Sequence, residues 1–177
     1  MAERLIKREA LNSTIRLDAY DPAWPAMFAR EEARIRHAIG AAALAVHHAG
    51  STSVPGLAAK PIIDIVLAVP DTRLEASYVP ALEGAGYALH AREPDWFEHR
   101  LLKRGDPAVN LHVFSEGCSE IDTMLAFRDR LRTHEDDRRL YEAAKRDLAQ
   151  RVWTYVQDYA DAKTQVVREI VARATAK

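Results

Sequence analysis

The chain has 177 residues, of which 48% are hydrophobic and 29% charged, and its formal net charge is −1. This composition predicts a folded protein with a sizeable core and excludes a disordered chain. The near-neutral charge gives no global signal for DNA binding, and no apolar run approaches the roughly 20 residues that span a bilayer. The single cysteine, Cys118, and a charged N-terminus without an apolar signal segment favour a cytoplasmic protein.

The first predicted helix follows a short N-terminal lead. Asp21 is expected to cap this helix, and Pro22 suits its first position. Apolar residues from Trp24 to Ile39 recur at helical spacing, and Gly40 is expected to end the helix.

Strand-forming segments occupy the middle of the chain. Residues 62–69 form a nearly continuous β-branched run, typical of a central strand covered on both faces. A second strand is expected at residues 43–48. Two more, at residues 96–104 and 108–114, are expected to form a hairpin around the turn at 105–107.

Helical patterns flank these strands. Residues 72–87 predict a helix that is interrupted near Pro80. Residues 119–176 contain neither proline nor glycine and predict a helical segment with densely mixed charges, whose simplest interpretation is a solvated face. One apolar stripe at helical spacing consists of Leu140, Ala144, Leu148 and Val152.

The order of these elements predicts the fold class. A helix, mixed strands with a crossover helix and a helical tail favour an α/β or α+β fold, in which a small mixed sheet is flanked by helices. No linker divides the chain, so we expect a single domain over residues 1–177 with a C-terminal helical segment. The pattern does not indicate an oligomeric state.

A turn of small polar residues follows the first strand. Gly50 allows the backbone to approach a ligand, and the N–H groups and hydroxyls of Ser51 and Thr52 can hold phosphate oxygens. The turn is not a P-loop, because Lys60 has the wrong spacing and no Ser or Thr follows it. A purely structural polar turn is the alternative interpretation.

Asp64 is the unusual residue of the 62–69 strand. An ionised carboxylate among apolar neighbours is costly to bury unless it is paired, hydrogen-bonded or bound to a metal. Strand alternation places Asp64 on the same face as Ile62 and Val66. A functional carboxylate near the Gly-Ser turn and a structural partner of an arginine are both consistent with this position.

Several stretches together resemble the GrpB family, also called UPF0157. They are "YDPAWPAMF", "AGSTSVPGLAAKPIIDI", "NLHVF", "FRDRLRTH" and "YEAAKRDLA", and the resemblance covers roughly residues 20–172. It implies a nucleotidyltransferase-like fold, a small mixed sheet flanked by helices. It also implies a link to coenzyme A metabolism, because some members are fused to dephospho-CoA kinases.

The resemblance to that superfamily implies roles for individual residues. Gly50 and Ser51 match the Gly-Ser turn, and Asp64 matches the first acid that holds Mg²⁺ against the phosphates. The second acid position falls on Val66, which cannot bind a metal, so the acid set is incomplete. The later strand that would supply a third acid offers Asn110 and His112.

Basic side chains are expected to neutralise a phosphate or carboxylate ligand. Lys145 lies four residues after Tyr141, and Lys163 four after Tyr159, so each pair shares a helical face. A surface salt bridge is the alternative role for each basic residue. The candidates are Lys60, Arg100, Arg128, Arg132, Lys145 and Lys163, with His112 as a further phosphate contact.

The residues and the resemblance together predict a protein that binds a nucleotide or another phosphate-bearing small molecule, CoA-related ones included. In the enzymatic form of this hypothesis, Asp64 is catalytic, binds Mg²⁺ and supports nucleotidyl transfer. Two alternatives remain: a non-catalytic module that senses a nucleotide or CoA metabolite, and an interaction protein built on the helical tail. Neither a membrane nor DNA is expected as a partner.

Overall fold

A six-stranded mixed sheet lies at the centre of the computed structural model, which describes residues 3–6 and 9–176. The strand order is β1-β5-β6-β7-β4-β3; β4 and β7 run parallel, and the other neighbours are antiparallel. Strands β2 and β8 form a separate antiparallel pair. The strands are β1 (Leu5–Ile6), β2 (Ala10–Ser13), β3 (Ala45–Ala49), β4 (Ile63–Val69), β5 (Ala88–Glu93), β6 (His99–Arg104), β7 (Val109–Ser115) and β8 (Trp153–Tyr155).

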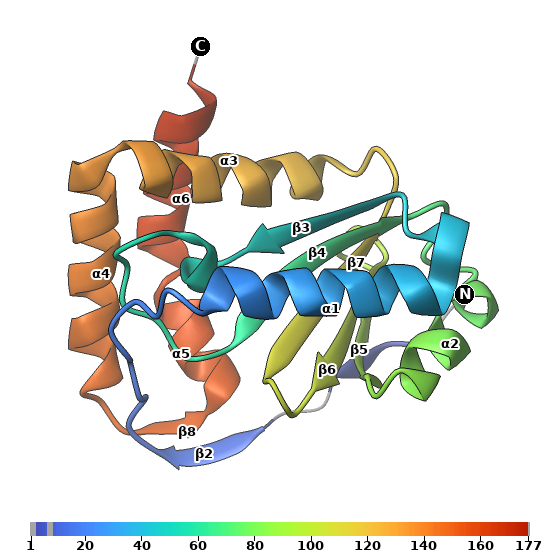
Figure 1. Cartoon of the computed structure of the whole chain (residues 1–177). Helices are drawn as coiled ribbons and strands as arrows, with labels where there is room; N and C mark the ends of the chain where they lie inside the picture. The colour runs from blue at the N-terminus through green and yellow to red at the C-terminus, as the bar shows by residue number, and fades with distance from the viewer. Residues whose placement is uncertain (1–2, 7–8, 177) are drawn as a thin grey trace.

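Helices cover both faces of this sheet (Figure 1). Helices α1 and α2 pack on one face, α3 packs on the other, and α4, α5 and α6 gather beyond the start of β4. The helices are α1 (Trp24–Ile39), α2 (Val79–Gly84), α3 (Ser119–Thr133), α4 (Glu135–Ala149), α5 (Val156–Ala162) and α6 (Thr164–Thr175).

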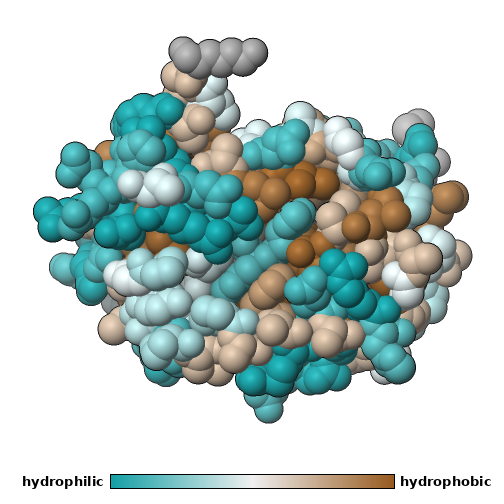
Figure 2. Space-filling model, turned by 45° about the horizontal axis from the view of Figure 1, so that its top comes forward, coloured by the Kyte–Doolittle hydropathy of each residue, from teal (hydrophilic) through white to brown (hydrophobic). Residues whose placement is uncertain are grey.

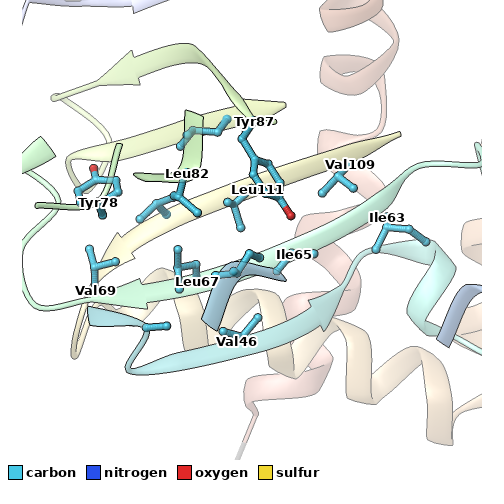
Figure 3. Close-up of a cluster of buried hydrophobic side chains, with 14 of the residues drawn as sticks. Val46, Ile63, Ile65, Leu67, Val69, Tyr78, Leu82, Tyr87, Val109 and Leu111 are labelled. Atoms are coloured by element: carbon cyan, nitrogen blue, oxygen red, sulfur yellow. The ribbon is translucent and has the colours of Figure 1, made fainter. Parts of the chain in front are cut away.

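The main core lies between the sheet and helices α1 and α2. Odd-numbered residues of β4, from Ile63 to Val69, point into this core beside Leu111, Leu82 and Tyr78 (Figure 3). Even-numbered Val66 and Ala68 face the other side, where they pack beneath α3. The continuous apolar run at 62–69 is therefore a strand covered on both faces, as predicted.

The predicted strands and the first helix are confirmed, with shifted boundaries. The strand expected at 43–48 is β3, and the expected hairpin is β6 and β7. Helix α1 begins at Trp24, two residues later than expected, because Asp21 closes a turn in which its Oδ1 accepts the N–H of Ala23 at 2.8 Å.

The helix predicted over 72–87 is only partly formed. A 3₁₀ turn at Glu75–Ser77 precedes the short helix α2, and the strand β5 that follows was not predicted. Strand β5 alternates exposed, half-buried and buried residues, and its own apolar signal is weak. Its pairing with β1 and β6 supplies the hydrogen bonds that its sequence did not indicate.

The helices predicted within residues 119–176 are confirmed as α3, α4, α5 and α6, but residues 150–155 are not helical. Residues 153–155 form β8, because the aromatic and β-branched run around them favours a strand. The apolar stripe predicted from Leu140 to Val152 is confirmed at Leu148, which is buried, but wrong at Leu140 and Val152, which are exposed. The buried face of α4 carries Tyr141, Lys145 and Leu148.

The surface is mainly hydrophilic on the face that Figure 2 presents, with hydrophobic residues gathered near its middle. In the part of the chain that the structure describes, no helix is long and apolar enough to cross a membrane.

Candidate functional site

A cavity of about 710 Å³ lies between the second face of the sheet and the C-terminal helices. Its sheet side is formed by alternate residues of β6 and β7, together with Asp64 at the start of β4. The turn at residues 50–52, the segment 59–62 and helices α4 and α5 complete the walls. Helix α3 covers only the far part of this sheet face, which leaves the start of β4 and β7 open to the cavity.

Gly50 brings the backbone of the turn against Asp64. Gly50 has a φ of +64°, and a Cβ atom there would lie 2.3 Å from Oδ2 of Asp64. The adjacent residue Ala49 pairs with Asp64 across β3 and β4. Both the left-handed backbone and the close approach therefore require glycine at this position.

Asp64 is half-buried and held by β7, its parallel neighbour. Asn110 is paired with Asp64 in register and donates its Nδ2 to Oδ1 at 2.9 Å, and Nε2 of His112 lies 3.8 Å from the same oxygen. Burial opposes ionisation of Asp64, but His112, Asn110 and the charge of Lys60 outweigh it and lower the pKa of the carboxyl. Asp64 is therefore ionised at neutral pH.

Four lysines line the cavity: Lys60, Lys103, Lys145 and Lys163. Lys103 forms a salt bridge with Glu9, whereas the charge of Asp64 acts on the other three. Nζ of Lys145 lies 4.9 Å from the ring centroid of Tyr141, and Nζ of Lys163 lies 4.4 Å from that of Tyr159. The shared helical faces predicted for these two pairs are confirmed. Among the described residues, none of the three ammonium groups forms a salt bridge with a carboxylate.

Burial shifts the titration of these lysines toward neutral pH. It lowers the pKa of Lys145 to about 7, with the charge of Lys163 adding to the effect, and the pKa of Lys163 to about 8. Burial and the charge of Lys163 also lower the pKa of Lys60. Three lysines without carboxylate partners around one cavity create a positive electrostatic environment there.

Tyr159 adds a polar group to the same wall. Its side chain is fully buried, and its hydroxyl has no hydrogen-bond partner among the described residues. Nζ of Lys60 and of Lys163 both lie over its ring, at 5.6 and 4.4 Å from the centroid. A buried hydroxyl without a partner is uncommon and suggests a site that a ligand or water completes.

A hydrogen-bonded array connects Asp64 to Glu93 at the end of β5. Oε2 of Glu93 lies 2.8 Å from Nδ1 of His99, and Nε2 of His99 lies 3.1 Å from Nδ1 of His112. Burial lowers the pKa of His99 to about 4, so this ring is neutral at pH 7. His99 and His112 thus meet across the hairpin, and the array fixes the orientation of His112 toward Asp64.

The structure brings most of the predicted site residues into one cavity. Ser51 accepts a hydrogen bond from Nζ of Lys145 at 3.0 Å, whereas the hydroxyl of Thr52 bonds to His48 and to the carbonyl of Ile62. The predicted residues that line the cavity are Gly50, Ser51, Thr52, Lys60, Asp64, His112, Lys145 and Lys163.

Arg100 lies outside this cavity, on the other face of the sheet. Its neighbour in register is Val113, which belongs to the core beneath α1, whereas His99 and Leu101 alternate toward the cavity. The side chain is 0% exposed and donates to Oε1 of Glu75 at 2.6 Å. Strand alternation therefore makes Arg100 a buried structural ion pair.

Arg128 and Arg132 also lie outside the cavity and support the turn from behind. Arg128 donates to the carbonyl of His48 at 3.0 Å, and Arg132 donates twice to the carbonyl of Ser53, at 3.0 and 2.9 Å. Both guanidinium groups thus hold backbone on either side of Gly50. In this structure they contact the protein rather than the cavity.

The residues around Asp64 do not fit a two-magnesium site. Val66, at the second acid position, is fully buried beneath α3, and Asn110 replaces an acid on β7. Across the described residues, no three side chains of His, Cys, Asp or Glu gather as a metal-binding group. Glu93 and Asp161 also line the cavity, but they are hydrogen-bonded to His99 and Gln157. The carboxylate of Asp64, close to three lysines, supplies too little negative charge for two divalent ions.

The cavity residues that were not predicted as site residues include Glu93, Trp96 and Tyr159. Glu93 ends β5, a strand that was not predicted. Trp96 lies in the turn before β6, whereas the sequence pattern placed it inside the strand predicted at 96–104. Tyr159 lies four residues before Lys163, and this helical spacing predicts that the tyrosine reaches the same cavity as the lysine.

Fold and cavity together define a mixed α/β protein with a lysine-lined cavity between its sheet and its C-terminal helices. The family model described as GrpB protein matches residues 14–173. A UPF0157 protein of Halalkalibacterium halodurans is 59% identical over 165 residues, which are 93% of this chain and 85% of the relative. A UPF0157 protein of Streptomyces coelicolor is 47% identical, with 92% and 85% covered. The chain belongs to the GrpB family, which confirms the resemblance.

Two further matches bear on fold and context. The crystal structure of conserved protein GrpB from Enterococcus faecalis superposes with a TM-score of 0.72 at 29% identity, covering 89% of this chain and 98% of that one. A protein of Mycolicibacterium paratuberculosis named dephospho-CoA kinase is 30% identical over 199 residues, which cover 98% of this chain and 49% of that relative.

Proposed function

We propose that the cavity binds a nucleotide or another phosphate-bearing small molecule, with Lys60, Lys145 and Lys163 neutralising the phosphates. The observation that carries this proposal is the presence of three buried or half-buried lysines around one cavity, none of them in a salt bridge with a described carboxylate. An unpaired buried cation is costly, and a bound anion removes that cost. The cavity volume falls in the usual range for small-molecule sites.

Asp64 has a defined place in this proposal. Its carboxylate lies beside Asn110 and faces the lysines, so it offsets part of their charge when no ligand is bound. A phosphate that approaches the lysines would be repelled by Asp64 unless a cation lies between them. Nucleotidyl transfer with Mg²⁺ is the second candidate function, and it depends on that cation.

The name dephospho-CoA kinase, carried by a relative, supports including CoA-type compounds among the ligands. These compounds share phosphate groups with nucleotides, so the same lysines would serve both.

Isothermal titration calorimetry tests the proposal with ATP, dephospho-CoA and CoA, each with and without Mg²⁺. We expect micromolar binding of at least one compound and a loss of about tenfold or more in Lys163→Met, whose ammonium group contacts Tyr159 but holds no hydrogen bond within the described chain. Arg139→Met is the matched control, because it removes an exposed charge on α4. Absence of binding by all three compounds, or equal losses in both variants, contradicts the proposal.

Asp64→Asn separates the two candidate functions. If binding alone is the function, removal of the negative charge should strengthen Mg²⁺-free binding, since repulsion between Asp64 and the phosphates is lost. If the protein transfers a nucleotidyl group with Mg²⁺, the same variant should weaken Mg²⁺-dependent binding and abolish release of pyrophosphate from the triphosphate.

A further inference from the structure

The turn between β5 and β6 places Trp96 in the wall of the cavity. Trp96 lines the cavity with Glu93 and His99, and 38% of its surface is exposed. The cavity wall at this point is therefore a large aromatic side chain, on the same side of the sheet as His112 and Asp64.

The backbone of this turn is held in an unfavourable conformation. Phe97 and Glu98 have φ values of +54° and +51°, in the left-handed region that side chains other than glycine disfavour. Two such residues in succession persist only where their surroundings fix them, and such strain is often found at functional sites.

Arg100 supplies that fixation. Its Nη1 donates to the carbonyl of Glu98 at 2.8 Å and to Oε2 of the same residue at 3.2 Å. The fully buried guanidinium is itself anchored by Glu75. Arg100 is thus a positioning residue for the turn that carries Trp96.

Neighbouring aromatic rings contact the indole of Trp96 at steep angles and orient it, but none of those in the described chain lies parallel to it. The rings of His99 and Phe114 meet Trp96 at interplanar angles of 70° and 77°, with centroids 4.8 and 5.6 Å away, and Phe97 meets it at 69°. Within the described chain no ring is stacked parallel on Trp96. A flat ligand ring can therefore take that place.

We propose that Trp96 stacks on the base of a nucleotide whose phosphates reach the lysines across the cavity. The inference rests on the proposed phosphate binding and narrows the ligand to compounds that carry an aromatic base. A cavity of about 710 Å³ accommodates a base, a ribose and phosphates together. Every base has a flat face that can stack on an aromatic side chain, so Trp96 favours ligands that carry a base but does not distinguish one base from another.

Titration with ATP and with inorganic tripolyphosphate tests this inference. We expect ATP to bind more tightly than tripolyphosphate, and Trp96→Ala to weaken ATP binding roughly 5- to 100-fold while it leaves tripolyphosphate binding unchanged within about twofold. Trp96→Phe should keep most of the preference for ATP, because it retains an aromatic face. Phe97→Ala is the matched control, since Phe97 is 47% exposed on the same turn but does not line the cavity.

The possible failures are distinguishable. Equal binding of ATP and tripolyphosphate, unaffected by Trp96→Ala, overturns stacking but supports the phosphate site. Equal losses in Trp96→Ala and Phe97→Ala also overturn stacking, because the turn alone would then explain them. Absence of binding by both compounds overturns the phosphate site and the stacking inference together.

Discussion

The α-carbon of Gly50 and the side chain of Asp64 are so close that a methyl group on Gly50 would lie 2.3 Å from Oδ2 and 2.8 Å from Cβ of Asp64. Real Cβ atoms do not approach other atoms this closely, so the small-residue turn and the carboxylate form one packed unit. The backbone of the turn limits the positions that the Asp64 side chain can occupy, and the contact with Asp64 requires glycine in the turn.

Gly50→Ala should therefore cost more stability than an ordinary glycine replacement. Gly50 has a φ of +64° and a ψ of −172°, a backbone conformation that costs an alanine about 1–3 kcal/mol, and the overlap with Asp64 adds a further cost, so we expect the free energy of unfolding to fall by about 3 kcal/mol. Gly56→Ala is the control, because Gly56 has a φ of +79° but open space around it. Urea denaturation of both variants measures the difference, and equal losses would show that the contact with Asp64 is relieved at no cost.

The buried lysines should make the stability of the ligand-free protein depend on pH. Unfolded Lys145 titrates near its ordinary pKa of 10.5, whereas burial lowers the folded value to about 7. Between these values the unfolded chain binds more protons, so stability rises as pH increases above 7. Lys163, with a folded pKa of about 8, acts in the same direction.

Chemical denaturation at pH 6, 7, 8 and 9 should show this rise in the wild type and a smaller rise in Lys145→Met. Arg139→Met, which removes an exposed charge, should keep the wild-type slope. A slope that is identical in all three proteins would mean that Lys145 is not desolvated in the folded state.

The tautomers of His99 and His112 follow from the array that begins at Glu93. The hydrogen bond to His99 lowers the pKa of Glu93, so the carboxylate accepts from Nδ1–H of His99. Nε2 of His99 then accepts from Nδ1–H of His112, which leaves Nε2 of His112 as the nitrogen nearest Asp64. We expect long-range ¹H–¹⁵N spectra at pH 7 to show the neutral, Nδ1-protonated form of His99 and a proton on Nδ1 of His112. Glu93→Gln should disturb the signals of His99 first, and an Nε2-protonated His99 in the wild type would reverse the direction of the array.

Arg132 should stabilise the turn that carries Gly50, although it does not reach the cavity. Its two N–H groups donate to the carbonyl of Ser53, which is buried. Arg132→Ala should lower the free energy of unfolding by about 1–2 kcal/mol and increase hydrogen exchange at residues 51–54. Arg139→Ala, which removes an exposed arginine one helix further on, should stay within about 0.5 kcal/mol of wild type. Unchanged exchange in Arg132→Ala would show that the turn is rigid without it.

Sequence patterns predicted the parts of the fold that depend on local chemistry. The β-branched run at 62–69 and the hairpin around 105–107 have strong periodic signals, and both strands of that hairpin and β4 were found. Strands β1, β2, β5 and β8 were not predicted, because they are short or weakly apolar and depend on pairing with distant segments. Leu140 was assigned to a buried face because it is apolar, whereas α4 buries Tyr141 and Lys145 against the cavity.

Site residues were placed correctly where spacing along one helix was enough to predict which side chains lie together. They were misplaced where the prediction required knowing which face of the sheet a strand residue occupies. Lys145 and Lys163 were placed correctly relative to their tyrosines by helical spacing alone. Arg100 was assigned to the ligand because it is basic, but one residue of register places it on the other face of the sheet. Trp96 could not be placed, because its position depends on two left-handed residues that follow it.

The pairing of β2 with β8 has a consequence for folding. Ala10 pairs with Tyr155, and the N–H of Val156, the first residue of α5, donates to the carbonyl of Glu9. The wall of the cavity that contains α5 is thus anchored to a segment that lies far from it in the chain. Closing so long a loop costs conformational entropy before the pairing returns any stabilisation, so this wall is expected to form late in folding. Gly50 and Asp64 are close in the sequence, and their packing does not depend on this distant pairing.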